Sequence, residues 1–269
     1  MSTKMAFATS VALAGVLILG SSVPRAADDD RSAQCRGLPS QSALRGALEG
    51  AQSQTNGGFG LQMWATVVNR DGVVCGVAFT GSDRGDQWPG SRVISAQKAN
   101  TANAFSLPDL ALSTANLYSA VQPGGSLFGL QESNPVDTQV AYGGNPSNYG
   151  RANDPMVGGR IGGVNVFGGG LALYNAAGHL VGGIGVSGDS SCADHNIAWR
   201  TRNTLNLDYV PAGVSGDAAR KDNIVYDITP QGGQMPGVST GGWGHPHCAN
   251  TAAGKATESA IAAALPPNE

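Results

Sequence analysis

Two short turns of the form Asn-x-x-Gly constrain the fold of this chain more than any other feature. They are Asn69–Gly72 and Asn175–Gly178, and short apolar runs flank each of them. Before the first turn, Met63, Ala65 and Val67 alternate with residues of the opposite face, which is the period of a strand. Glycine readily takes the positive φ that a tight hairpin turn needs. The sequence therefore predicts two β-hairpins, with strands at 61–68, 73–80, 171–174 and 179–186.

Helical signals surround the two hairpins. Leu44, Leu48 and Ala51 share the apolar stripe of a helix that opens at Pro39 and ends at Asn56. An antiparallel sheet with helices packed on it follows, so the expected fold class is α+β. The other expected helices are 91–105, about 108–119, 190–206 and a short one near 252–264.

Composition excludes several classes of protein. Glycine occupies 40 of 269 positions and only 13% of residues are charged, which argues against a coiled coil or helical bundle. The 41% of hydrophobic residues argues against a wholly disordered chain. A net charge of −3 with 16 Lys and Arg offers no basic surface for phosphates, so no nucleic-acid partner is expected.

The first 27 residues have the layout of a secretory signal peptide. Lys4 precedes the apolar run Met5–Gly20, and small residues with Pro24 follow it. The alternative is an anchor that stays in the membrane, although the run is shorter than the ~20 residues that a span needs. We expect a secreted or periplasmic protein whose mature chain has no membrane span.

Export makes the four cysteines informative. Cys35, Cys75, Cys192 and Cys248 are an even number in an oxidising compartment, and they allow three connectivities. We favour Cys35–Cys75 and Cys192–Cys248, because each bond would tie a terminal segment to the core. Four free thiols are the alternative.

Three regions follow from these signals. The folded domain is expected at 35–206, with a loop insertion at 122–160 that is rich in Gly, Asn and Pro. We expect this insertion to be a long surface loop with at most one strand. The segment 207–269 is expected to be an irregular tail, apart from its last helix, tied by a cysteine.

The helix expected at 91–105 carries a lysine on its apolar stripe. Ile94, Lys98, Thr101 and Phe105 fall within about 60° of one another on a helical wheel. Either the lysine stem packs while its ammonium reaches water, or the stripe lines a cleft where Lys98 meets an anionic group such as a carboxylate.

Glycines and histidines mark other candidate sites. The segment Gly182–Gly188 would let a ligand approach a strand, and the helix after it would offer N–H groups to an anion. His179 and His195 are candidate ligands of haem iron or a metal, against the commoner role of surface histidines. The run His245–Cys248 would bind a metal if Cys248 is reduced.

Three pieces of the sequence resemble one known family. They are Asp71–Val74, the helix Ala96–Ala102 with its K-A-x-T-A-like signature, and Gly178–Gly188 with Asp194 after it. Over 40–206 the chain resembles the GlcG/HbpS-like haem-binding domain, also called the haem-degrading domain and related to the C-terminal part of PduO-type proteins. The resemblance implies a profilin-like α+β fold, assembly into homo-oligomers, and haem or another tetrapyrrole as ligand.

The resemblance also implies a ligand cleft. Lys98, Thr101, Ser187 and Asp194 would lie around it. In a haem site Lys98 would meet the propionates, and the axial ligand would be His195 or His179. The apolar slot of that site would include Ile184 and Phe105.

Three functions remain open from the sequence. The leading hypothesis is an exported protein that binds haem, a related tetrapyrrole or a small anionic ligand. The first alternative is an enzyme that degrades haem or acts on a small organic acid in the same cleft, with Asp194 or His195 in proton transfer, although no paired-carboxylate or nucleophile–base signature is present. The second is an extracellular interaction protein without a ligand.

Overall fold

The computed structural model describes Met1 and residues 33–231, 234–248 and 254–269. Apart from Met1, the predicted signal peptide at 1–27 lies outside these residues. No helix in the described part of the chain is both long and apolar enough to cross a membrane.

A four-stranded antiparallel sheet forms the centre of the molecule. Both predicted hairpins are confirmed, and Gly72 and Gly178 each have a φ of 74°. The hairpins meet where β1 pairs with β4, with Trp64 opposite Ser187, so that the order of strands is β2-β1-β4-β3. The strands are β1 (Trp64–Asn69), β2 (Val74–Phe79), β3 (Gly170–Tyr174) and β4 (Leu180–Ser187).

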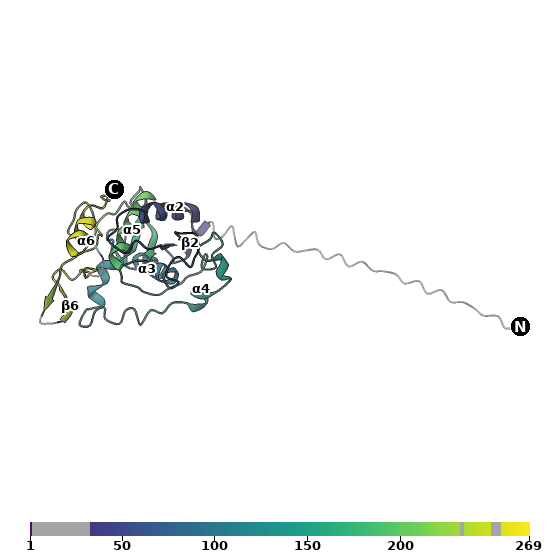
Figure 1. Ribbon diagram of the computed structural model, residues 1–269, viewed down its shortest axis with the longest axis horizontal. Helices are drawn as coiled ribbons and strands as arrows, with labels where there is room; N and C mark the ends of the chain where they lie inside the picture. Colours follow the sequence, from purple (N-terminus) through teal and green to yellow (C-terminus); the bar gives the residue numbers. More distant parts are fainter. Residues whose placement is uncertain (2–32, 232–233, 249–253) are drawn as a thin grey trace.

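Helices cover both faces of this sheet, which confirms the α+β class (Figure 1). One face is covered by α3 (Ser91–Phe105), and the other by α2 (Gln41–Gln52) and α5 (Ser191–Thr204). The hydroxyls of Ser40 and Ser190 cap α2 and α5 by accepting backbone N–H groups.

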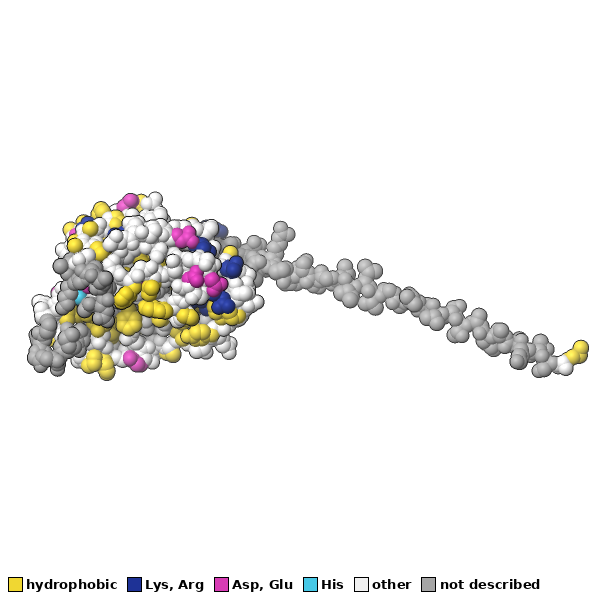
Figure 2. Space-filling view, viewed as in Figure 1, with side chains coloured by type: hydrophobic (Ala, Val, Ile, Leu, Met, Phe, Trp, Pro, Cys, Tyr) yellow, Lys and Arg dark blue, Asp and Glu magenta, His cyan; other side chains and the backbone are white. Residues whose placement is uncertain are grey.

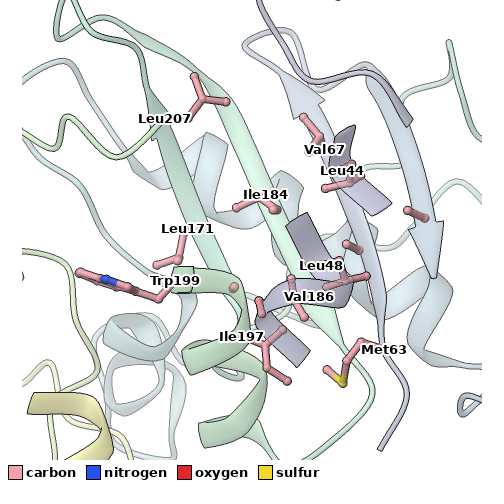
Figure 3. Close-up of a cluster of buried hydrophobic side chains, with 14 of the residues drawn as sticks. Leu44, Leu48, Met63, Val67, Leu171, Ile184, Val186, Ile197, Trp199 and Leu207 are labelled. Atoms are coloured by element: carbon pink, nitrogen blue, oxygen red, sulfur yellow. The ribbon is translucent and has the colours of Figure 1, made fainter. Parts of the chain in front are cut away.

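The largest buried cluster fills the space between the sheet and the pair α2 and α5. Its side chains come from the alternating inward positions of the four strands and from one stripe of each helix, and Figure 3 shows them converging. Burial of these side chains shields one face of the sheet from solvent. The labelled members are Leu44, Leu48, Met63, Val67, Leu171, Ile184, Val186, Ile197, Trp199 and Leu207.

The opposite face of β4 is smooth because it carries glycine. A Cβ at Gly183 would overlap the carbonyl oxygen of Ala99, and one at Gly185 would overlap that of Ser95. Helix α3 therefore packs its backbone against the strand. The space in which we expected a ligand to approach Gly182–Gly188 is occupied by this helix.

The helix predicted at about 108–119 is wrong. The structure has two short 3₁₀ turns there, η1 (Thr114–Leu117) and η2 (Ser119–Val121). Ser113 and Asn116 form a reciprocal capping box, which makes η1 begin only at Thr114. The Thr114 hydroxyl accepts the Gly170 N–H at 2.8 Å, so side chains here bond to distant backbone groups.

The insertion 122–160 is more than a surface loop. It contains α4 (Thr138–Tyr142) and the 3₁₀ turn η3 (Pro146–Asn148), but no strand. Its Met156 is fully buried in the cluster that lies between the sheet and α3. Asp154 is buried as well and accepts from Arg92 Nε of α3 at 3.0 Å. The insertion is therefore part of the domain core.

The tail is also more ordered than predicted. It forms a hairpin of β5 (Ile228–Gln231) and β6 (Gln234–Ser239) and ends with α6 (Gly254–Ala263). Its Asp222 pairs with the buried Arg202 of α5 at 2.6 Å. Hydrophobic patterning does not reveal such a contact, since the two residues are polar.

Both favoured disulfides are present. Cys35–Cys75 ties the N-terminal segment to β2, and Cys192–Cys248 ties the tail to the first turn of α5. Within the described residues no cysteine is free. Both bonds close long loops, which removes entropy from the unfolded chain.

We predict that Gly185→Ala lowers the free energy of unfolding by at least ~2 kcal/mol, because the new methyl group would push α3 away from β4. The matched control is Gly46→Ala on the exposed surface of α2, where a Cβ meets nothing within 4 Å. That change should stabilise by up to ~1 kcal/mol. Denaturant unfolding measures both, and equal effects would contradict the packing of α3 described here.

Candidate functional site

A buried ion pair joins α3 to α5 at the end of β4. Lys98 Nζ lies 2.7 Å from Asp194 Oδ2 and donates to the Val186 carbonyl at 3.1 Å. The two side chains are 1% and 4% exposed, so the ammonium reaches neither solvent nor an open cleft. Lys98 does meet a carboxylate, but it is one supplied by the protein itself.

Burial governs the electrostatics of this pair. It raises the pKa of Asp194 to about 6, and the neighbouring Lys98 ammonium opposes that rise. The Asp189 N–H also donates to Asp194 at 2.9 Å. The carboxyl is therefore ionised at neutral pH, and each charge stabilises the other in a buried site.

The structure brings only some of the predicted ligand residues together. Ser187 follows Val186, the residue whose carbonyl accepts from Lys98. The Ser187 hydroxyl lies 3.3 Å from the Ser91 hydroxyl. The Thr101 hydroxyl donates to the Gln97 carbonyl of its own helix and accepts the Asn165 N–H at 3.0 Å. Ile184 faces α2 and α5 on the other side of the sheet, and Phe105 packs in a separate cluster.

The two candidate axial histidines have different surroundings. His195 is fully buried, and its Nε2 accepts the Ile224 N–H at 3.1 Å. Burial lowers the pKa of His195 to about 4, so its ring is neutral. His179 is exposed beside the turn of the second hairpin. A bond from His195 Nε2 to iron would require the loss of the bond to Ile224.

A third histidine holds the tail against α5. The Ser191 hydroxyl lies 2.8 Å from His245 Nε2, and His245 Nδ1 lies 2.7 Å from the Pro246 carbonyl. A carbonyl only accepts, so Nδ1 carries the proton and Nε2 accepts from Ser191. Burial lowers the pKa of His245 to about 3, which keeps this tautomer neutral.

An aromatic pocket of about 290 Å³ lies between α3, the loop before it and the insertion. We call it the arginine pocket, because Arg84 and Arg92 line it together with rings from β1 and the insertion. Arg84 is exposed, as is 63% of Tyr142. Figure 2 shows charged and apolar side chains together over the region of α4. The lining residues are Trp64, Arg84, Gly85, Pro89, Gly90, Arg92, Val93, Tyr142 and Tyr149.

One wall of the arginine pocket is held rigidly. The Arg92 guanidinium binds both carboxylate oxygens of Asp154 and lies 3.6 Å from the centre of the Tyr149 ring. Sequence reasoning missed this pocket because the insertion was interpreted as a surface loop. Arg92 next to Val93 and Ile94 in α3 was at most a weak signal, because the sequence does not show that the arginine is buried or which acid it meets.

Comparison with known proteins identifies the family. A family model described as "Haem degrading protein HbpS-like" matches residues 40–202, more than half of the chain. The chain therefore belongs to the HbpS-like family, as its motifs predicted. No curated protein is significantly similar to it.

The solved structures to which this chain is similar are distant in sequence. The crystal structure of a PduOC–haem complex shares 24% identity and a TM-score of 0.43, covering 62% of this chain and 91% of that one. Klebsiella pneumoniae protein ORFY also shares 24% identity, with a TM-score of 0.41 and coverage of 62% and 90%. HbpS shares 18%, with a TM-score of 0.38 and coverage of 61% and 86%.

We predict that Lys98→Met costs about 3–5 kcal/mol of stability at pH 8, because Asp194 stays buried without its cation. The loss should shrink at pH 5, where Asp194 can take up a proton, and Asp194→Asn in the same chain should restore part of it. Arg45→Met is the control, because its partner Glu49 is 47% exposed, and it should cost less than ~1 kcal/mol. Equal costs in chemical denaturation would refute a structural role for the pair.

Because His195 is buried, we predict that the folded protein loses stability in acid. Its pKa falls from 6.5 in the unfolded chain to about 4 in the fold, so the unfolded chain binds the proton first as the pH drops. Its contribution is complete above pH 6.5 and is lost progressively towards pH 4, by about 3 kcal/mol.

His195→Gln should therefore flatten the plot of unfolding free energy against pH between 6.5 and 4. The exposed His179→Gln should leave its slope unchanged. Asp194, whose pKa is raised, acts in the opposite sense, but it is present in all three proteins and cancels in the comparison. Parallel slopes for all three would show that His195 titrates normally.

Proposed function

We propose that this protein is an exported binding protein for haem or a related tetrapyrrole. Membership of the HbpS-like family over 40–202 is the observation that carries the proposal. A flat, apolar ring with carboxylate groups needs aromatic surface and a cation. The arginine pocket supplies both.

The residues of the arginine pocket fit such a ligand. Tyr142 and the half-buried Tyr149 offer ring surface, while Arg84 offers an exposed guanidinium for a propionate. Arg92 is already paired with Asp154, so it shapes the wall of the pocket. A volume of about 290 Å³ accepts one edge of a macrocycle, and the remainder would lie against the exposed Trp88 and Tyr142.

Iron, if the ligand is haem, needs a protein ligand at this pocket. Tyr142 is the exposed phenol of the lining, and tyrosinate is one of the haem ligands that proteins use. The Tyr149 hydroxyl already donates to the Tyr142 and Gly143 carbonyls. In a haem complex, Tyr142 would therefore hold the iron, in place of His195 or His179.

Export is the second part of the proposal. The fold contains two disulfides, which persist in oxidising compartments and are rare in the cytosol. Secretory cleavage of the first 27 residues would leave both disulfides in the mature chain. Detection of the mature protein in the periplasmic or culture fraction, shortened at its N-terminus, tests this part.

We predict that haemin gives a shifted Soret band on binding, and that Arg84→Gln weakens binding by about tenfold through the loss of a charge-assisted hydrogen bond. Arg160→Gln is the control, since Arg160 is exposed and absent from the lining. Tyr142→Phe should move the Soret band of the haemin complex but leave the affinity for metal-free protoporphyrin unchanged. Absorbance titration with both porphyrins measures these effects.

Two results would overturn this assignment. The first is the absence of any spectral shift with either porphyrin. The second is equal affinity in Arg84→Gln and wild type, which would place the ligand elsewhere. Aerobic incubation of the complex with a reductant separates binding from turnover, because an enzyme that degrades haem bleaches the Soret band under oxygen.

A further inference from the structure

A second group of ligating side chains lies where the tail meets α5. The candidate ligand atoms of Cys192, Cys248 and Glu258 all lie within 4.8 Å of one another. His247 adds a ring nitrogen 3.1 Å from the Glu258 carboxylate. Cys192 is fully buried and Glu258 is 1% exposed. Two sulfurs and a carboxylate thus converge in a site largely shielded from solvent, and the imidazole of His247 borders it through the carboxylate.

This donor set is one that zinc prefers. Zinc in proteins is bound tetrahedrally by Cys thiolate, His nitrogen and carboxylate oxygen. In the oxidised chain the two sulfurs are bonded to each other, and a disulfide offers no thiolate to a metal. Reduction would release two thiolates beside the Glu258 carboxylate, which makes three ligands. A rotation of the neighbouring His247 ring towards them would supply the fourth.

We propose that the dithiol form of this chain binds one zinc ion through Cys192, Cys248, Glu258 and His247. A dithiol reductant supplies two electrons and two protons, so that the sulfur–sulfur bond breaks, two thiols form and the reductant becomes a disulfide. Zinc then replaces the two thiol protons, which pass to solvent. The disulfide and the zinc site are alternative states of the same cysteines.

The surroundings orient the ligands for this role. Cys192 lies in the first turn of α5, where the helix terminus favours a thiolate. The Glu258 carboxylate accepts the Cys248 N–H at 3.0 Å, and the Tyr226 ring stacks on His247 with 4.2 Å between ring centres. Such outer contacts fix the direction of metal ligands.

The other disulfide provides an internal comparison. Across the described residues, no group of three ligating side chains forms around Cys35–Cys75. The two disulfides therefore predict opposite behaviour after reduction, although both yield a pair of thiols. The zinc residues are also separate from the lining of the arginine pocket, so haem binding and metal binding can fail independently.

The test uses the full chain, reduced with dithiothreitol and desalted without oxygen. Cobalt(II) is the probe, because it shows a thiolate charge-transfer band and the visible bands of tetrahedral coordination. We expect one equivalent of cobalt bound in the reduced chain, none in the oxidised chain, and displacement by zinc. Reduced Cys35→Ser/Cys75→Ser should behave like wild type, and reduced Cys192→Ser/Cys248→Ser should lack the charge-transfer band.

Two single variants test the proposal even if replacing both cysteines unfolds the chain. Glu258→Gln and His247→Gln retain both cysteines, and each should bind zinc at least ~10-fold more weakly after reduction. His179→Gln is the matched control and should bind as tightly as wild type. A charge-transfer band that persists in Cys192→Ser/Cys248→Ser, or equal zinc affinity in all three histidine and glutamate variants, would overturn the proposal.

Discussion

The fold depends on the direct contact between the backbone of α3 and the glycines of β4. Gly183 and Gly185 leave no side chain between strand and helix, so α3 lies closer to the sheet than larger residues would allow. This approach places Lys98 in the interior at the end of β4, beside the Val186 carbonyl. A buried ammonium requires a counter-charge, and Asp194 provides it from the helix on the opposite face. The glycine surface therefore determines both the packing and the ion pair.

The same packing decides where a ligand can bind. The first turn of α5 was a candidate anion site, but its groups are already used by the protein. The Cys192 N–H donates towards Cys248 Sγ, and the Ala193 N–H donates to its own cap. The Asp189 carboxylate accepts N–H groups of the loop before β1, including that of Phe59 at 2.9 Å. Since the predicted cleft is filled, open aromatic surface remains at the insertion, where sequence patterns gave little information.

Local signals explain which parts of the fold the sequence predicted. The two Asn-x-x-Gly turns and the apolar stripe of α2 act over a few residues, and the structure confirms both. The predictions from sequence were wrong where polar contacts between residues far apart in the chain determine the structure. Arg92 and Asp154 are 62 positions apart and lie on elements of different type, and Thr114 is held by Gly170, 56 positions away. No period along the chain marks such pairs.

At the candidate site, too, local signals were predictable from the sequence and contacts between distant residues were not. The motif around Gly178–Gly188 was sufficient to identify the family, yet it did not show that Lys98 and Asp194 satisfy each other. Charge pairing in a dry interior leaves no cation for a ligand, whereas Arg84 is exposed and retains its charge for a carboxylate. In a protein with few charged residues, the separation of buried from exposed cations is therefore the ground on which we propose a ligand site beside the insertion. That inference required the burial of each side chain, which the order of residues alone does not contain.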